Sequence, residues 1–148
     1  MMIHKLRHFS AYMNPNTNVI VLFMSPGGYV KLKNFVRYQA ILDYKNVHLV
    51  YFNMFDLISD TLIEEWILKG NLDRSWYPVV HTSDILRYTI LSKYPTLYLD
   101  LDVIVKYPIE VLDAKSFACY QNDGVEVNNA IMKFTGEDGK KVANIFLK

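Results

Sequence analysis

The stretch "KYPTLYLDLDVIVKYP", residues 93–108, closes an apolar strand with two like charges one residue apart. Successive side chains of a strand point to opposite faces, so Asp100 and Asp102 are expected on one face, with carboxylates roughly 7 Å apart. Two carboxylates at this spacing repel each other unless a cation lies between them. The stretch predicts either a divalent metal site or two solvated acids that only terminate a surface strand.

The segments around this stretch alternate between strand and helix patterns, which predicts an α/β domain with a largely parallel sheet. Ligands of such sheets bind at the carboxyl ends of the strands, and Asp100 lies at that end of "TLYL". Pro78 suits a first helical turn, and Gly70 suits a helix end. The strands are expected at 18–25, 46–53, 96–99, 116–123 and 128–134, and the helices at 31–44, 54–60, 61–70 and 77–94, with another from about Gly139.

Composition limits the class of protein before any motif is considered. The chain has 148 residues, 51% of them hydrophobic, which is enough apolar surface for one core, so we expect a single domain over residues 1–148. A net charge of +1 with scattered basic residues argues against a nucleic-acid partner. Cys119 is the one cysteine of the sequence, which excludes an internal disulfide or a cysteine-built zinc site.

The two ends of the sequence suggest a piece of a larger protein. The first residues contain no apolar run of the length that a signal peptide or membrane anchor requires. The last helical pattern stops at Lys148. We therefore expect a fragment of a larger catalytic domain, which reaches a membrane only through an anchor that these residues do not contain.

Two charged residues lie upstream of the aspartates in the sequence. Hard cations such as Mg²⁺ and Mn²⁺ bind carboxylate oxygens and keep positions for phosphate, so Asp100 and Asp102 would suit a metal–diphosphate site. Upstream, Asp84 and Arg87 lie three residues apart on one face of the helix expected at 77–94. A spacing of three residues on a helix also permits a surface ion pair between Asp84 and Arg87 with no role in a site.

The combined segment "SDILRYTILSKYPTLYLDLDVIV" resembles glycosyltransferases with an Asp-x-Asp motif, and in particular the animal α1,4-galactosyltransferase and α1,4-N-acetylglucosaminyltransferase group. That pattern is Ser-Asp-x-x-Arg, an apolar helix, Tyr-x-Asp-x-Asp and an apolar strand. The stretches "NPNTNVIVLFMS", "NVHLVYFNMFDLISDTLIEEW" and "NNAIMKF" resemble further blocks of the family in the same order. One departure is the pair Pro95 and Thr96, where the family usually has two glycines.

The resemblance implies a GT-A-type, Rossmann-like sheet with flanking helices, here incomplete, that binds a nucleotide sugar. By that resemblance Asp100 and Asp102 would hold Mn²⁺ (or Mg²⁺) on the donor diphosphate. Asp100 would also belong to the residues that bind the donor sugar or its nucleotide. Asp84 and Arg87 would contact the donor sugar. Asn128 and Asn129 match a block near the donor or acceptor, although a turn before a strand explains them equally well.

The implied function is retaining, Mn²⁺-dependent transfer of a hexose, galactose or an N-acetylhexosamine, from a UDP-sugar to a glycolipid or glycan acceptor. Members of the family work on the lumenal side of the Golgi. One alternative is a truncated or pseudoenzyme domain that binds metal and nucleotide sugar without turnover. A second is another metal-dependent phosphoryl-handling enzyme, although "YLDLDVIVKYP" lacks the Thr or Gly-rich continuation expected of one.

Overall fold

The structure is a computed structural model, and it describes residues 12, 14–23, 43–109, 116–121 and 124–147. The chain forms two compact units, which are described separately. The first comprises the described parts of residues 1–52 and 100–113, and the second those of 53–99 and 114–148. Within the described residues, no helix is both long enough and apolar enough to cross a bilayer.

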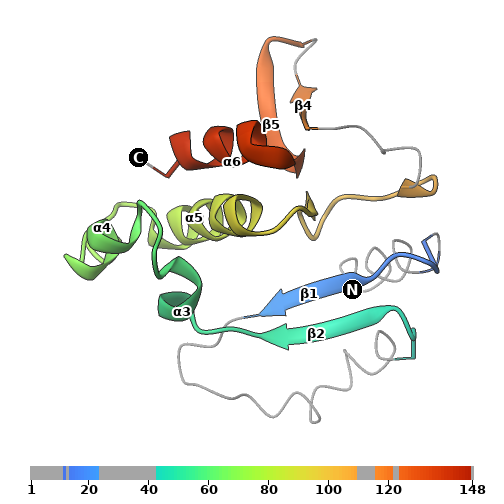
Figure 1. The fold of residues 1–148 in the computed structure, drawn as a ribbon, viewed down its shortest axis with the longest axis horizontal. Helices are drawn as coiled ribbons and strands as arrows, with labels where there is room; N and C mark the ends of the chain where they lie inside the picture. Colours follow the sequence, from blue (N-terminus) through green and yellow to red (C-terminus); the bar gives the residue numbers. More distant parts are fainter. Residues whose placement is uncertain (1–11, 13, 24–42, 110–115, 122–123, 148) are drawn as a thin grey trace. The chain divides into compact units, whose positions relative to one another are not determined.

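The first unit contains two parallel strands, β1 (Val19–Phe23) and β2 (Val47–Tyr51), which are drawn side by side in Figure 1. Val19 pairs with Val47, and both strands are rich in β-branched and aromatic residues, which the pleated surface favours. Asn46 fixes the entry to β2 by donating from Nδ2 to the carbonyls of Asn14 and Thr17 at 2.9 and 3.0 Å. Both strands were predicted; most of the helix expected at 31–44 lies outside the described residues.

The second unit contains a three-stranded sheet of β3 (Leu97–Leu99), β5 (Glu126–Lys133) and β4 (Phe117–Gln121), in the order β3-β5-β4. Both of its ladders are antiparallel. The prediction of a largely parallel sheet is therefore wrong for this unit, although it holds for β1 and β2. A strand as short as β3 carries little pattern from which its pairing direction could have been predicted.

The helices of this unit are α3 (Met54–Ile58), α4 (Glu64–Leu68), α5 (Pro78–Lys93) and α6 (Gly136–Ile145). Pro78 opens α5 as predicted, because its missing N–H and fixed φ suit a first turn. The helix α6 begins three residues before the expected Gly139. Figure 1 shows α6 alongside α5, and the rings of Tyr88 and Phe146 stack between the two segments, with centroids 4.5 Å apart.

Two apolar clusters hold α5 in place. Ile85 packs with buried residues of the α3 and α4 region, and Leu91 packs with Met132 and Phe134 of the β5 region. Burying a side chain of this size stabilises the fold by roughly 1.5–3 kcal/mol. Because α5 is anchored on both sides, the polar residues that it carries between these anchors have fixed positions.

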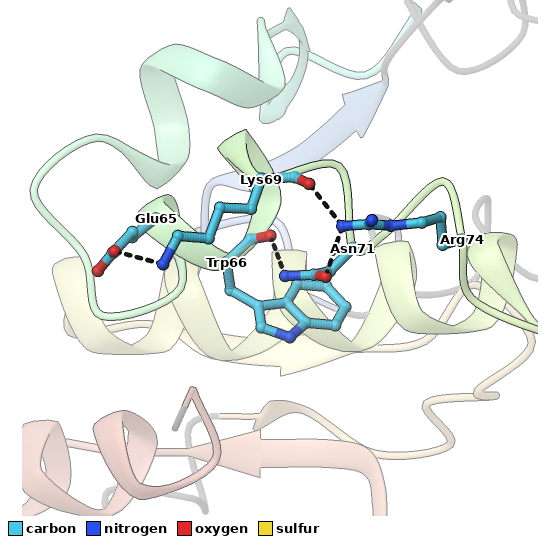
Figure 2. A network of polar contacts seen from close by, with 5 residues as sticks. All are labelled: Glu65, Trp66, Lys69, Asn71 and Arg74. Atoms are coloured by element: carbon cyan, nitrogen blue, oxygen red, sulfur yellow. Dashed lines mark hydrogen bonds and ion pairs between the residues drawn. The ribbon is translucent and has the colours of Figure 1, made fainter.

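The end of α4 is secured by polar contacts, which Figure 2 shows. Gly70 has a φ of 72°, the left-handed conformation that commonly ends a helix and that was predicted here. Arg74 donates from Nη2 to the Lys69 carbonyl at 2.7 Å and to the Asn71 side chain at 3.0 Å. Lys69 also pairs with Glu65 at 2.6 Å, and both the hydrogen bond and the charge of Lys69 lower the pKa of Glu65.

Candidate functional site

The guanidinium of Arg87 is the centre of a polar cluster in the second unit. Its side chain is only 7% exposed, so it must be paired and hydrogen-bonded to be tolerated there. Nη1 donates to the Asn129 carbonyl at 3.0 Å, and Nη2 donates to the Ser83 hydroxyl at 3.1 Å. Nε lies 3.5 Å from Oδ1 of Asp84. The pair is therefore not the solvated surface pair that spacing alone allowed.

Asp84 lies at the edge of this cluster and is more accessible than Arg87. Its side chain is 35% exposed, and its Oδ1 also accepts from Nδ2 of Asn129 at 3.2 Å. Asn129 thus contacts both partners of the ion pair, one through its backbone and one through its side chain. The structure brings together three residues that the resemblance placed in the site: Asp84, Arg87 and Asn129.

Tyr98 covers the face of Arg87. The guanidinium carbon lies 5.2 Å from the centroid of the tyrosine ring, within range of a cation–π contact. Tyr98 is the tyrosine of the Tyr-x-Asp-x-Asp stretch, and Ser83, Asp84 and Arg87 form the Ser-Asp-x-x-Arg stretch. The two sequence motifs therefore meet at Arg87. Sequence reasoning assigned no role to Tyr98 or Ser83, although their places in the motifs were the available signal.

An irregularity in β5 brings Asn129 to α5. Along β4 the partner of Ala118 is Met132, but the partner of Cys119 is already Asn128, so residues 129–131 bulge out of the β4 ladder. Bulges re-aim side chains and are frequent beside functional sites. The alternative prediction of a turn before a strand is wrong for both asparagines, because both lie inside β5.

Asn128 has different neighbours from Asn129. Its Oδ1 accepts from the backbone N–H of Ala130 at 2.7 Å, a contact inside the bulge. Its Nδ2 donates to Oε1 of Gln121 on β4 at 2.6 Å. The described contacts of Asn128 therefore secure the bulge, whereas those of Asn129 reach the Asp84–Arg87 pair.

Asp100 and Asp102 belong to the first unit and lie in a turn rather than on a strand. The strand β3 ends at Leu99, and the N–H of Val103 donates to the Asp100 carbonyl at 3.1 Å. The strand-face argument for their shared orientation is therefore wrong, and β3 is not a central parallel strand. Aspartate suits turn positions because its side chain competes for local backbone hydrogen bonds.

The chemistry of these two carboxylates fits a hard divalent cation. Asp100 is half-buried and Asp102 is exposed. The described residues contain no group of three or more acidic, histidine or cysteine side chains that could enclose a metal. Mg²⁺-like ions are commonly bound by one or two carboxylates, with substrate phosphates completing the coordination. A pair of aspartates is thus a sufficient protein contribution for a metal shared with a diphosphate.

The substitution of Pro95 and Thr96 for glycines is accommodated without strain. Neither residue has a positive φ, and the Thr96 N–H donates to the Tyr94 carbonyl at 2.9 Å. The segment between α5 and β3 therefore adopts a backbone conformation that proline and threonine can both take.

The sequence that carries these two motifs matches a known family of glycosyltransferases. Residues 11–118 match the family described as "Glycosyltransferase sugar-binding region containing DXD motif", and the chain belongs to this family. It is also 28% identical, over 99 residues, to lactosylceramide 4-alpha-galactosyltransferase of Pan troglodytes. The match covers 65% of this chain and 28% of that relative. No solved structure matches the chain.

Proposed function

We propose that this chain forms the donor-binding part of a glycosyltransferase that transfers a hexose from a UDP-sugar to a glycan or glycolipid acceptor. The observation that carries the proposal is the meeting of the Ser-Asp-x-x-Arg and Tyr-x-Asp-x-Asp motifs at Arg87, in a chain of the Asp-x-Asp family. The name of the Pan troglodytes relative supports galactose as the sugar and a lactosylceramide-type glycolipid as the acceptor.

In this proposal two groups of residues have different roles. Asp84, Arg87, Asn128 and Asn129 serve the donor sugar, as the resemblance implies. Asp100 and Asp102 hold Mn²⁺ or Mg²⁺ at the diphosphate. When bound, such an ion supplies Lewis-acid stabilisation of the negative charge that develops on the departing nucleoside diphosphate. A GT-A-type fold, retention of configuration and a place in the Golgi lumen belong to the same proposal.

The carboxylate of Asp84 suits sugar recognition because its partly exposed oxygens accept hydrogen bonds from hydroxyl groups. Charge-assisted hydrogen bonds of this kind are stronger than neutral ones. The buried guanidinium of Arg87 and the side-chain amide of Asn129 both contact Oδ1 of this carboxylate and so fix its direction. The chain therefore offers a preorganised acceptor group for a polar ligand.

The test is release of UDP from UDP-galactose with Mn²⁺, with and without a lactosyl acceptor, in wild type, Asp102→Asn and the control Asp73→Asn. The control removes an exposed carboxylate outside both motifs. The proposal predicts slow, Mn²⁺-dependent release of UDP in wild type and control, because the chain spans only 28% of its relative, and at least a tenfold loss in Asp102→Asn. UDP-galactose binding without any turnover would favour the pseudoenzyme alternative, and equal turnover in all three proteins would refute the metal assignment.

A further inference from the structure

We infer that the exposed rings of Trp76 and Tyr77 form a stacking platform for the sugar rings of the acceptor. The inference rests on the proposed function and deepens it, because it gives the acceptor a place on the described part of the chain. Neither residue belongs to the Ser-Asp-x-x-Arg or the Tyr-x-Asp-x-Asp motif.

A run of apolar and aromatic residues is exposed where α5 begins. Trp76 is 93% exposed and Tyr77 is 67% exposed. Pro78, Val79 and Val80, which open the helix, are exposed as well. Scattered apolar residues are normal on a protein surface, but a contiguous exposed patch marks a binding site. The start of α5 is therefore a candidate binding surface.

Hydrogen bonds hold the backbone of this run at both ends. On one side, the Ser75 N–H donates at 3.1 Å to the carbonyl of Leu72, which is buried in the core. On the other, the Ser75 hydroxyl accepts from the Tyr77 N–H at 3.1 Å and lies 2.6 Å from Nδ1 of His81 on α5. A surface that is ordered before binding loses less conformational freedom when a ligand arrives.

The two side chains suit a sugar ring chemically. Each offers a flat apolar face and one polar group, the indole N–H of Trp76 or the phenolic O–H of Tyr77. A pyranose ring has the matching arrangement, with a face of C–H groups and hydroxyls around its rim. Stacking buries the two apolar faces and leaves the hydroxyls free to keep their hydrogen bonds.

The charges around the run favour a neutral ligand over a lipid surface. Between residues 72 and 86 the sequence has one arginine, Arg74, and no lysine, against two acidic residues, Asp73 and Asp84. The guanidinium of Arg74 donates to two backbone carbonyls at the end of α4. Anionic membrane surfaces attract clusters of lysine and arginine, which this segment lacks. An uncharged glycan fits the platform better.

The position of the platform along α5 suits an acceptor. Asp84, which the proposed function assigns to the donor sugar, lies six residues after Pro78 on the same helix. At 1.5 Å per residue this separation is about 9 Å along the helix axis, which is comparable with the length of a disaccharide. A disaccharide that stacks on Trp76 and Tyr77 can therefore extend toward the donor.

The first experiment uses Trp76 as its own reporter. The sequence contains two tryptophans, so Trp66→Phe leaves Trp76 as the single fluorophore. Lactose is the probe, and sorbitol, an acyclic polyol without a ring face, is the control. We expect lactose to shift the emission of Trp76 to shorter wavelength in a saturable manner and to protect it from acrylamide, and sorbitol to do neither. An emission that does not respond to lactose would overturn the inference.

The second experiment removes the other ring. In the Trp66→Phe background, Tyr77→Ala should weaken lactose binding about 3- to 10-fold, because one of two stacking contacts is lost. The matched control is Tyr120→Ala on β4, where the tyrosine is 69% exposed, and it should leave the Kd for lactose unchanged. Equal Kd values for lactose in the two variants would contradict a platform made by both rings.

Other occupants of the patch give different results. Vesicles of phosphatidylcholine and phosphatidylserine without glycolipid should leave the emission of Trp76 unchanged. A larger shift with vesicles than with lactose would overturn the inference in favour of a lipid surface. A shift that follows protein concentration alone would overturn it in favour of a second copy of the chain.

The assay of UDP release separates this inference from the proposed function. Trp76→Ala should weaken the dependence of UDP release on a lactosyl acceptor, as a rise in the KM for the acceptor, and leave the Kd for UDP unchanged. Acceptor-dependent release that is the same in Trp76→Ala and wild type would overturn the platform and leave the proposed function standing. Saturable lactose binding at Trp76 in a protein that releases no UDP would support the platform and refute only the transfer.

Discussion

The guanidinium carbon of Arg87 lies 5.2 Å from the centre of the Tyr98 ring, and this contact joins the helix α5 to the strand β3. Each residue comes from a different sequence motif, and each motif alone is short. Their contact gives the tyrosine of Tyr-x-Asp-x-Asp a physical role, since it covers a buried cation that a neighbouring carboxylate and carbonyl also hold.

The first prediction concerns this contact. Replacement of Tyr98 by Leu should destabilise the protein by about 1 kcal/mol more than replacement by Phe, because Phe keeps the aromatic face above Arg87. Urea denaturation of the two variants measures the difference. Equal stability of Tyr98→Leu and Tyr98→Phe would show that the ring face contributes nothing to holding Arg87.

A second prediction concerns Gly139, which lies buried inside α6. Glycine to alanine normally stabilises a helix by roughly 1 kcal/mol. Here an added Cβ would lie 2.8 Å from the carbonyl carbon of Phe134, which is backbone and cannot move aside as a flexible side chain would. Gly139→Ala should therefore destabilise the protein by about 1–3 kcal/mol.

The control for this substitution is Lys141→Ala at an exposed position of the same helix. It should change stability by less than about 0.5 kcal/mol. Thermal unfolding of both variants provides the comparison. A Gly139→Ala protein as stable as wild type would mean that α6 does not approach Phe134 this closely.

The third prediction concerns the exposed pair of Glu65 and Lys69. The hydrogen bond and the charge of Lys69 lower the pKa of Glu65, so the folded state favours the ionised carboxylate. This preference is present at neutral pH and is lost as the pH falls through the lowered pKa. Lys69→Met should raise the pKa of Glu65 toward its ordinary value, and high salt should do the same in wild type.

Carbon-detected NMR titration of the Glu65 carboxyl measures this effect directly. The substitution Lys141→Met provides the control, because it removes a lysine of the same type from a different helix. A pKa of Glu65 that is identical in wild type and Lys69→Met would contradict the contact between the two side chains.

The sequence predicted the existence of most elements but not all of their pairings. The helix α5 could be predicted because Pro78 and a long apolar pattern mark it. The strands β1 and β2 could be predicted from their β-branched and aromatic residues. The antiparallel pairing of β3 with β5 could not be predicted, because β3 has only three residues and its partner lies more than thirty residues away along the chain. Local pattern carries no information on such a non-local register.

The candidate site was predicted in part for similar reasons. Helical spacing was enough to put Asp84 beside Arg87, since residues three apart are neighbours on a helix. The separate contacts of Asn128 and Asn129 depend on a bulge, which breaks the alternation that sequence reasoning relies on. The strand-face argument for Asp100 and Asp102 was wrong because the strand ends one residue earlier, at Leu99.

The most direct test of the central claim is the binding of Mn²⁺ in the presence of UDP, followed by the electron paramagnetic resonance signal of free aqueous Mn²⁺. We expect wild type and the control Asp73→Asn to reduce this signal in a UDP-dependent manner, because two carboxylates and a diphosphate together suit a hard cation. Asp100→Asn and Asp102→Asn should each weaken this binding at least tenfold. Undiminished Mn²⁺ binding by Asp100→Asn and Asp102→Asn would contradict the claim that these aspartates form the metal site of a glycosyltransferase.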